Sequence, residues 1–159
     1  MNHYFTAQIC KNGDCIVASI EEWPEQCADY CPKCVSKTIS ACPSCNADIR
    51  GFYSEDGVAS YRPYSVPAYC HHCGQPYPWT QSAIEAASEL IQEEIMLDRD
   101  LREKLISSLP DIVSETPKTN LAIVRFKRFL ASAGKFTADA LRQFVIDFGC
   151  ELAKDQLGL

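Results

Sequence analysis

Cysteine pairs in the first half of the chain constrain its fold more than any other feature. Nine of the ten cysteines lie in the first 73 residues, and six of them form three Cys-x-x-Cys pairs. A Cys-x-x-Cys turn places two sulfurs on one side of a tight loop, where they can share a tetrahedral metal ion. In a reducing compartment such clusters indicate metal binding rather than disulfides. The sequence therefore predicts a fold organised around metal–thiolate sites.

Eight cysteines, arranged as four pairs, are the expected metal ligands. Three pairs have the Cys-x-x-Cys spacing, whereas the first is looser and contains Gly13, which can supply the left-handed residue of a turn. The pairs are Cys10/Cys15, Cys31/Cys34, Cys42/Cys45 and Cys70/Cys73. Four thiolates per site predict two structural zinc ions, each contributing on the order of 10 kcal/mol to folding at neutral pH.

The four pairs can be joined in three ways. Sequential joining leaves 15 residues inside the first site and 24 inside the second, and each of these stretches can hold a hairpin. Nested joining leaves only the seven residues 35–41 inside one site. The third way is an alternating cross-brace, as in RING-type domains. This sequence has nothing like the Cys-x-His centre that those domains carry. Sequential joining into two consecutive zinc ribbons is favoured, and the other two arrangements stay open.

The composition changes near Trp79, where two prolines make the connecting segment stiff. Residues 1–79 hold the cysteine pairs and short β-type stretches, including residues 3–9 and a possible hairpin of residues 48–53 with 64–69. Residues 80–159 hold amphipathic patterns typical of three or four helices. The predicted fold is α+β, with a small β-rich double zinc ribbon at 1–79 and a helical bundle at 80–159.

Helix boundaries follow from capping signals in the second half. Pro110 should end or kink the second helix, and Phe136 with Leu141 has the spacing of a hydrophobic staple. The expected capping residues of the four helices are Ser82, Asp98, Thr116 and Thr137.

Charge disfavours a general nucleic-acid-binding protein. The formal net charge is −6, and zinc ligation by eight thiolates would bring it to about −10. Residues 121–142 form a local exception, whose basic side chains are Arg125, Lys127, Arg128, Lys135 and Arg142. This patch keeps nucleic acid open as an alternative partner, although an acidic surface disfavours it.

No constellation of catalytic residues is visible. A catalytic zinc needs three ligands and an open position, and no odd triad suggests one. His71 and His72 lie inside a cysteine pair, where we expect them to pack over the metal or donate to its sulfurs. Cys27 and Cys150 are expected to be partly buried bystanders that bind no metal, and a nucleophilic role for either would need a positioned base. We therefore expect a protein that is not an enzyme.

Neither a signal peptide nor an apolar run of membrane-spanning length is visible, so a cytoplasmic protein without membrane contact is expected. Three hypotheses about function remain. The first is a protein-interaction module that binds a partner or a second copy through its C-terminal helices. The second is a nucleic-acid-binding regulator that uses the ribbons and the basic patch at 121–142. The third is an accessory subunit or a small enzyme with an unrecognised site.

Four stretches together resemble a bacterial family known as domain of unknown function 2321. They are residues 7–13, 31–39, 42–51 and 67–80, and the last, with Pro-Ala-Tyr-Cys-x-x-Cys-Gly-x-Pro-Tyr-Pro-Trp-Thr, is the most specific. The resemblance extends over the helical half. It implies a bacterial zinc-binding protein with a double ribbon and a helical C-terminus, and it implies no activity.

One position departs from the family pattern. Members of the family carry a histidine directly after the glycine of the first motif, whereas this chain has Asp14 there, followed by Cys15. Two possibilities stay open. Either Cys15 has taken over the ligand role, or Asp14 completes a weaker site that contains oxygen.

Overall fold

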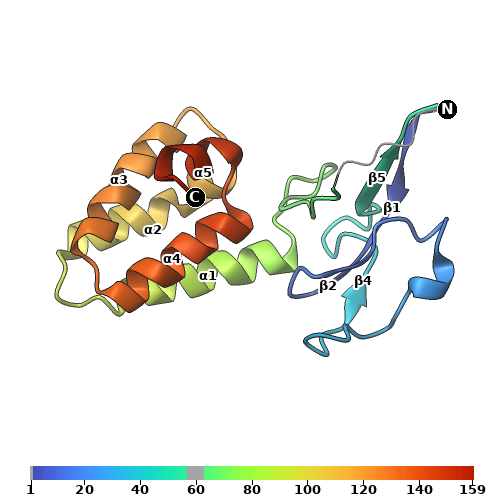
Figure 1. Cartoon of the computed structure of the whole chain (residues 1–159), viewed down its shortest axis with the longest axis horizontal. Helices are drawn as coiled ribbons and strands as arrows, with labels where there is room; N and C mark the ends of the chain where they lie inside the picture. Colours follow the sequence, from blue (N-terminus) through green and yellow to red (C-terminus); the bar gives the residue numbers. More distant parts are fainter. Residues whose placement is uncertain (1, 57–62) are drawn as a thin grey trace. The chain divides into compact units, whose positions relative to one another are not determined.

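The computed structural model describes residues 2–56 and 63–159, which divide into two compact units. The first unit, Met1–Gln81, carries short strands and the cysteine pairs, and the second, Ser82–Leu159, carries helices (Figure 1). The fold is therefore α+β, with small antiparallel sheets followed by helices.

Two small antiparallel sheets form the framework of the first unit. β2 (Gln8–Cys10) lies between β3 (Cys15–Val17) and β4 (Thr38–Ile39) in a three-stranded sheet. β1 (His3–Thr6) pairs with β5 (Arg50–Ser54) in a two-stranded sheet. A short 3₁₀ helix, η1 (Pro24–Gln26), follows β3. The sheets thus begin or end next to Cys10 and Cys15, and they hold the first ligand loop between β2 and β3.

The expected hairpin of residues 48–53 with 64–69 is wrong. β5 pairs with β1 instead, and residues 63–68 form no strand. Pro63 and Pro67 lack the backbone N–H that a strand ladder requires, which explains the irregular segment. The segment is tied to β5 in another way, because the Tyr64 hydroxyl donates to the carbonyl oxygen of Arg50 over 2.7 Å.

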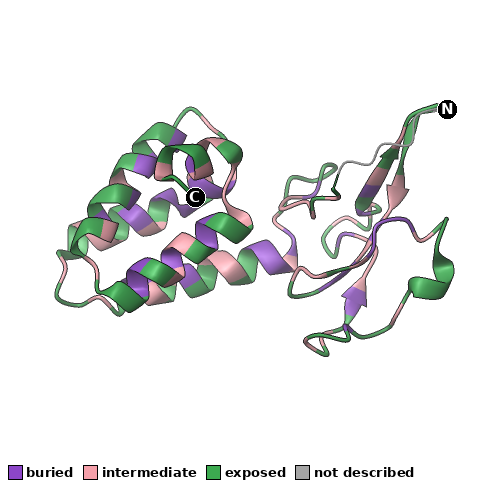
Figure 2. Ribbon diagram, in the orientation of Figure 1, coloured by how far each residue is buried: buried purple, intermediate pink, exposed green. Residues whose placement is uncertain are grey.

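Five helices make up the rest of the chain, one more than the largest number expected. α1 spans Pro78–Gln92, α2 Arg99–Val113, α3 Thr119–Ser132, α4 Lys135–Phe148 and α5 Glu151–Leu157. α3 packs on α2 and α5, and α4 contacts α2 and α5. Figure 2 shows that each long helix alternates between buried and exposed sides. The centre of this unit is apolar, and its fully buried side chains include Leu105, Leu109, Ile112, Phe126, Phe129, Leu141 and Val145.

Several expected helix boundaries need correction. α1 begins at Pro78 and not at Ser82, because a proline is compatible with the first turn of a helix. Asp98 caps α2 as expected, accepting a hydrogen bond from the backbone N–H of Asp100. Pro110 does not end α2, which continues to Val113. Pro110 has no N–H to donate within the helix, and the burial of Ile112 and Val113 in the core offsets the loss of that hydrogen bond.

The expected start of the fourth helix is also wrong. α4 begins at Lys135 with Gly134 at the N-cap position, so Thr137 lies inside the helix and is buried. Phe136 is 79% exposed and forms no hydrophobic staple with Leu141. The apolar pattern from Leu141 to Leu152 also predicts one continuous helix, whereas α4 ends at Phe148 and a separate helix, α5, begins at Glu151. Among the helices of the described chain, none combines the length and apolar character that a bilayer crossing needs.

Candidate metal centres

The three Cys-x-x-Cys pairs form hairpins with the same backbone geometry. In each, the residue before the first cysteine pairs in antiparallel fashion with the residue six positions after that cysteine. These pairs are Tyr30 with Lys37, Ala41 with Asp48, and Tyr69 with Pro76. We call them hairpins 1, 2 and 3 in chain order.

Two backbone hydrogen bonds close each hairpin. The N–H of the first cysteine donates to the carbonyl oxygen five residues later, over 2.8, 2.8 and 2.9 Å in hairpins 1, 2 and 3. The N–H of the residue after the second cysteine donates back to the first cysteine's carbonyl, over 2.8, 2.8 and 2.9 Å. That residue has a positive φ, which is 62° at Val35, 62° at Asn46 and 74° at Gly74. The shared geometry places both sulfurs of each hairpin on one side.

A fourth loop between β2 and β3 completes the set. Here the N–H of Cys10 donates to the carbonyl oxygen of Asp14, and the N–H of Gly13 donates to that of Cys10, each over 2.9 Å. Gly13 has a φ of +95°, and a Cβ at this position would lie 3.0 Å from the Cβ of Trp79. The turn therefore needs glycine at position 13 for two reasons: the positive φ and the close approach of the Trp79 side chain.

Hairpins 2 and 3 bring four cysteines into one cluster. The ligand atoms of Cys42, Cys45, Cys70 and Cys73 all lie within 4.8 Å of one another. The sulfurs of Cys42 and Cys73 are 3.8 Å apart, and those of Cys45 and Cys70 are 3.7 Å apart. A tetrahedral zinc with Zn–S bonds of about 2.3 Å requires sulfurs about 3.8 Å apart, so the donors fit such an ion.

Hairpin 1 and the β2–β3 loop form a cluster with one oxygen donor. Its members are Cys10, Asp14, Cys31 and Cys34, whose ligand atoms lie within 4.8 Å of one another. The sulfurs of Cys10 and Cys34 are 3.7 Å apart, which is again the edge expected for a metal–thiolate tetrahedron. The Asp14 Oδ2 atom lies 3.6 Å from the Cys10 sulfur and 3.7 Å from the Cys31 sulfur.

The structure thus groups seven of the eight expected cysteines, in the sequential arrangement, and leaves Cys15 outside. Cys15 opens β3 opposite Ile9 and is an exposed residue. Successive side chains of an extended segment point to opposite sides, so Asp14 and Cys15 cannot both face the cluster. Asp14 faces the sulfurs, and its Oδ1 atom forms an ion pair with Lys33 Nζ over 3.2 Å.

At two of the cluster cysteines, hydrogen bonds to sulfur favour the thiolate form that binds metal. The Ser36 hydroxyl and N–H lower the pKa of Cys34 to about 6. Backbone N–H groups of Cys73 and His72 lower the pKa of Cys70 to about 6, and the His72 N–H lies 3.4 Å from that sulfur. Burial acts in the opposite direction on Cys10 and raises its pKa to about 11, despite a hydrogen bond from the Asp14 N–H.

The other cysteines and the histidines lie outside both clusters. His72 donates to a sulfur through its backbone N–H, while neither His71 nor His72 contributes a ligand atom to either cluster. Cys27 is exposed rather than partly buried, and Cys150 occupies the N-cap position of α5.

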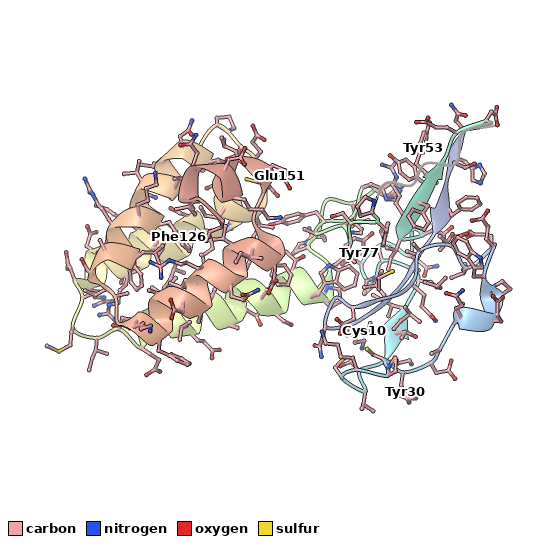
Figure 3. All side chains as sticks on the ribbon, in the orientation of Figure 1. Cys10, Tyr30, Tyr53, Tyr77, Phe126 and Glu151 are labelled. Atoms are coloured by element: carbon pink, nitrogen blue, oxygen red, sulfur yellow. The ribbon has the colours of Figure 1, made fainter. Side chains whose placement is uncertain are left out.

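Sequence reasoning missed Tyr77 as a neighbour of the second cluster. Its side chain is 1% exposed, and the pKa of its hydroxyl is raised by burial and by the Cys70 thiol. Its ring, labelled in Figure 3, stacks on that of Trp79 with centroids 4.7 Å apart. The Trp79 indole donates to the carbonyl oxygen of Pro67 over 2.9 Å. The motif around Trp79 is visible in the sequence, but its pattern alone does not reveal that Tyr77 lies beside the second cluster.

Comparison with known proteins gives the family and little more. No curated protein and no solved structure matches the chain. One family model, described as an uncharacterized protein conserved in bacteria (DUF2321), matches residues 3–157. Because the match covers nearly the whole sequence and includes all four ligand loops, the chain belongs to this bacterial family.

Proposed function

We propose that this protein is a non-enzymatic protein-interaction module of bacterial type, stabilised by two structural zinc ions. The observation that carries the proposal is that both clusters are closed. Each gathers four donor atoms from two loops of the first unit, so a tetrahedral ion held by all four would have no open position for a substrate or water. Closed four-ligand sites are typical of structural zinc, whereas catalytic sites keep one position open.

Zinc suits both donor sets. The second cluster has four thiolates, and zinc accepts three thiolates and one carboxylate in the first. Metal binding supplies folding free energy that this unit needs, because its apolar core is small and its sheets have only two and three strands. The zinc ions would hold hairpins 1 to 3 rigid, and rigid hairpins present side chains to a partner at low entropic cost.

The basic patch at 121–142 gives weaker support for nucleic acid as a partner. The Arg125 guanidinium donates to the Ser108 hydroxyl over 2.8 Å, and Arg142 pairs with Asp139 over 3.1 Å. These two cations are thus engaged within the helical unit. The apolar stripe of the last helices through which self-association was expected is mostly covered within the chain, because Leu141, Phe144 and Val145 are buried and Phe148 and Leu152 are half-buried.

Metal content and metal access test the proposal together. Protein purified without chelators should contain two zinc ions per chain, and cobalt-substituted protein should show the intense d–d bands of tetrahedral thiolate coordination. Azide added to the cobalt form should leave these bands unchanged, because neither site has an open position. One zinc or none, or a spectrum that shifts with azide, would contradict two closed structural sites.

Metal removal supplies a second test. A chelator should unfold residues 1–81 and leave the helical unit folded, because all candidate ligands lie in the first unit and the helical unit has its own core. Two-dimensional NMR distinguishes the two, since resonances of the helical unit should keep their dispersion. Loss of both sets of resonances, or of neither, would argue against metal-dependent folding of the first unit.

A further inference from the structure

Hairpin 1 carries a backbone conformation that its residue type disfavours. The position after the second cysteine is left-handed in all three hairpins, and hairpins 2 and 3 place Asn46 and Gly74 there. Asparagine and glycine adopt positive φ readily, whereas a β-branched residue there is an outlier. Hairpin 1 nevertheless has Val35 at this position, with φ at 62°. The chain thus keeps a strained residue where its own other hairpins have unstrained ones.

Packing does not explain Val35. Its side chain is 74% exposed, so the fold gains little from its burial. Strained residues persist at positions where function needs the side chain. Tyr30, which precedes the first cysteine of the same hairpin, is 61% exposed (Figure 3). Two large apolar side chains are therefore presented to solvent by one metal hairpin.

Three lysines accompany these two side chains in hairpin 1 and the neighbouring β2–β3 loop. Lys33 lies between the cysteines of hairpin 1, where hairpins 2 and 3 have Ser44 and His72. Lys37 pairs with Tyr30, where the other hairpins have Asp48 and Pro76. Lys11 joins them, because its backbone N–H donates to the carbonyl oxygen of Lys37 over 3.0 Å.

We call Lys11, Tyr30, Lys33, Val35 and Lys37 the hairpin 1 face. All five are exposed residues. Two acidic residues lie in its segments, residues 10–14 and 28–41: Asp14, which faces the metal cluster and pairs with Lys33, and Asp29. These segments thus carry three lysines against two aspartates, beside two exposed apolar side chains, in a chain whose net charge is −6 before zinc ligation.

We propose that the hairpin 1 face docks an acidic segment of a partner protein, one that presents carboxylates around an apolar side chain. Lysines at the rim complement the carboxylates, and Tyr30 with Val35 forms the apolar centre. The inference rests on the proposed function, since the face exists only while the first metal site holds hairpin 1 closed.

Charge and side-chain type favour a peptide over nucleic acid. Val35 has no π face on which a base could stack, and Tyr30 is the single aromatic side chain of the face. The acidic net charge, which is −6 before zinc ligation, repels a long polyanion, while a short acidic segment meets mainly the local lysines.

Peptide selection on the full zinc-loaded chain tests the proposal. Phage-displayed random 12-residue peptides are selected on the wild-type protein, and the enriched peptides are synthesised with a fluorescent label. Their binding is measured by anisotropy at 150 mM NaCl. A labelled 20-nucleotide single-stranded DNA is measured in parallel. We expect enriched sequences with several Asp or Glu residues flanking an apolar residue, and weaker binding as salt increases.

Val35→Asn separates docking from a structural role. Asparagine suits the left-handed backbone, so a purely structural role predicts equal or higher stability and unchanged binding. Docking predicts that peptide affinity falls by about tenfold while the protein becomes no less stable, as expected for a central apolar contact. Lys37→Ser should weaken binding by about threefold and reduce its salt dependence. Asn46→Gly in hairpin 2 and Lys127→Ser on α3 are the matched controls, which should bind as the wild type does.

Several results would overturn the inference. These are enriched peptides without acidic residues, no enrichment at all, or unchanged affinity of Val35→Asn and Lys37→Ser. Tighter binding of the DNA than of the peptides, lost in the same two variants, would assign the face to nucleic acid instead. The zinc content distinguishes failure of the docking proposal from failure of the proposed function. Two zinc ions without acidic-peptide binding refute this inference alone, whereas fewer than two refute the proposed function.

Discussion

The strain at Val35 predicts that replacing this valine with asparagine stabilises the first unit. A left-handed conformation costs an ordinary L-residue about 1–2 kcal/mol, and asparagine avoids much of this cost. The side chain is 74% exposed, so the apolar burial that is lost is worth about 0.5 kcal/mol. We therefore expect the free energy of unfolding to increase by about 0.5–1.5 kcal/mol. Val35→Gly should gain less, because glycine also raises the entropy of the unfolded chain.

Guanidinium unfolding at a buffered free zinc concentration measures this change, because zinc binding otherwise alters the apparent stability. Tryptophan fluorescence can report on the first unit, since Trp79 is 3% exposed and lies against Gly13. The reciprocal controls are Asn46→Val and Gly74→Ala, which should lower stability by about 1–2 kcal/mol. A Cβ at Gly74 would have no atom within 4 Å, so its effect comes from the backbone alone.

The reasoning fails if Val35→Asn unfolds at the same or a lower denaturant concentration than the wild type while Asn46→Val loses stability. That pattern would mean that the two left-handed positions are not equivalent, and that Val35 makes a stabilising contribution which its exposure does not indicate.

Three further predictions concern single positions. Asp14→Ala should reduce the zinc content from two ions toward one, whereas Cys15→Ser should leave it at two by elemental analysis; the reverse result would return the ligand role to Cys15. Gly51→Ala should destabilise the first unit by about 1–3 kcal/mol in denaturant unfolding, because a Cβ there would overlap the backbone oxygen of Ala18; an unchanged midpoint would show that β5 can shift. Pro110→Ala should raise the thermal stability of the helical unit by about 1–3 kcal/mol, since the exposed proline interrupts the hydrogen bonds of α2; a lower melting temperature would show that the proline is needed there.

Sequence patterns correctly predicted structural features that are set by residues close together in the chain. The Cys-x-x-Cys spacing indicates a hairpin because both sulfurs and the turn lie within a few residues, and Asp98 caps α2 by bonding two residues along the chain. The α+β fold and the family followed from such patterns, and both are confirmed.

Features that depend on distant residues were not predictable in this way. The sequence does not distinguish Asp14 from Cys15 as the fourth ligand of the first cluster. The folded chain does, because the Asp14 carboxylate lies beside the Cys31 sulfur. β5 could pair with any extended segment, and its choice of β1 reflects tertiary packing. Pro110 stays within a helix because Ile112 and Val113 are buried beyond it, which capping rules do not include.

If the two clusters bind metal as proposed, the order of their donors along the chain sets the order in which the centres can be filled. Every donor of the first centre lies between residues 10 and 34, and every donor of the second lies between residues 42 and 73. A nascent chain can therefore capture its first ion while the donors of the second are still inside the ribosome. β1, by contrast, must wait for β5, which is made only after the first centre is complete. If both centres bind zinc as proposed, this order favours molecules loaded at the first centre alone when zinc is scarce.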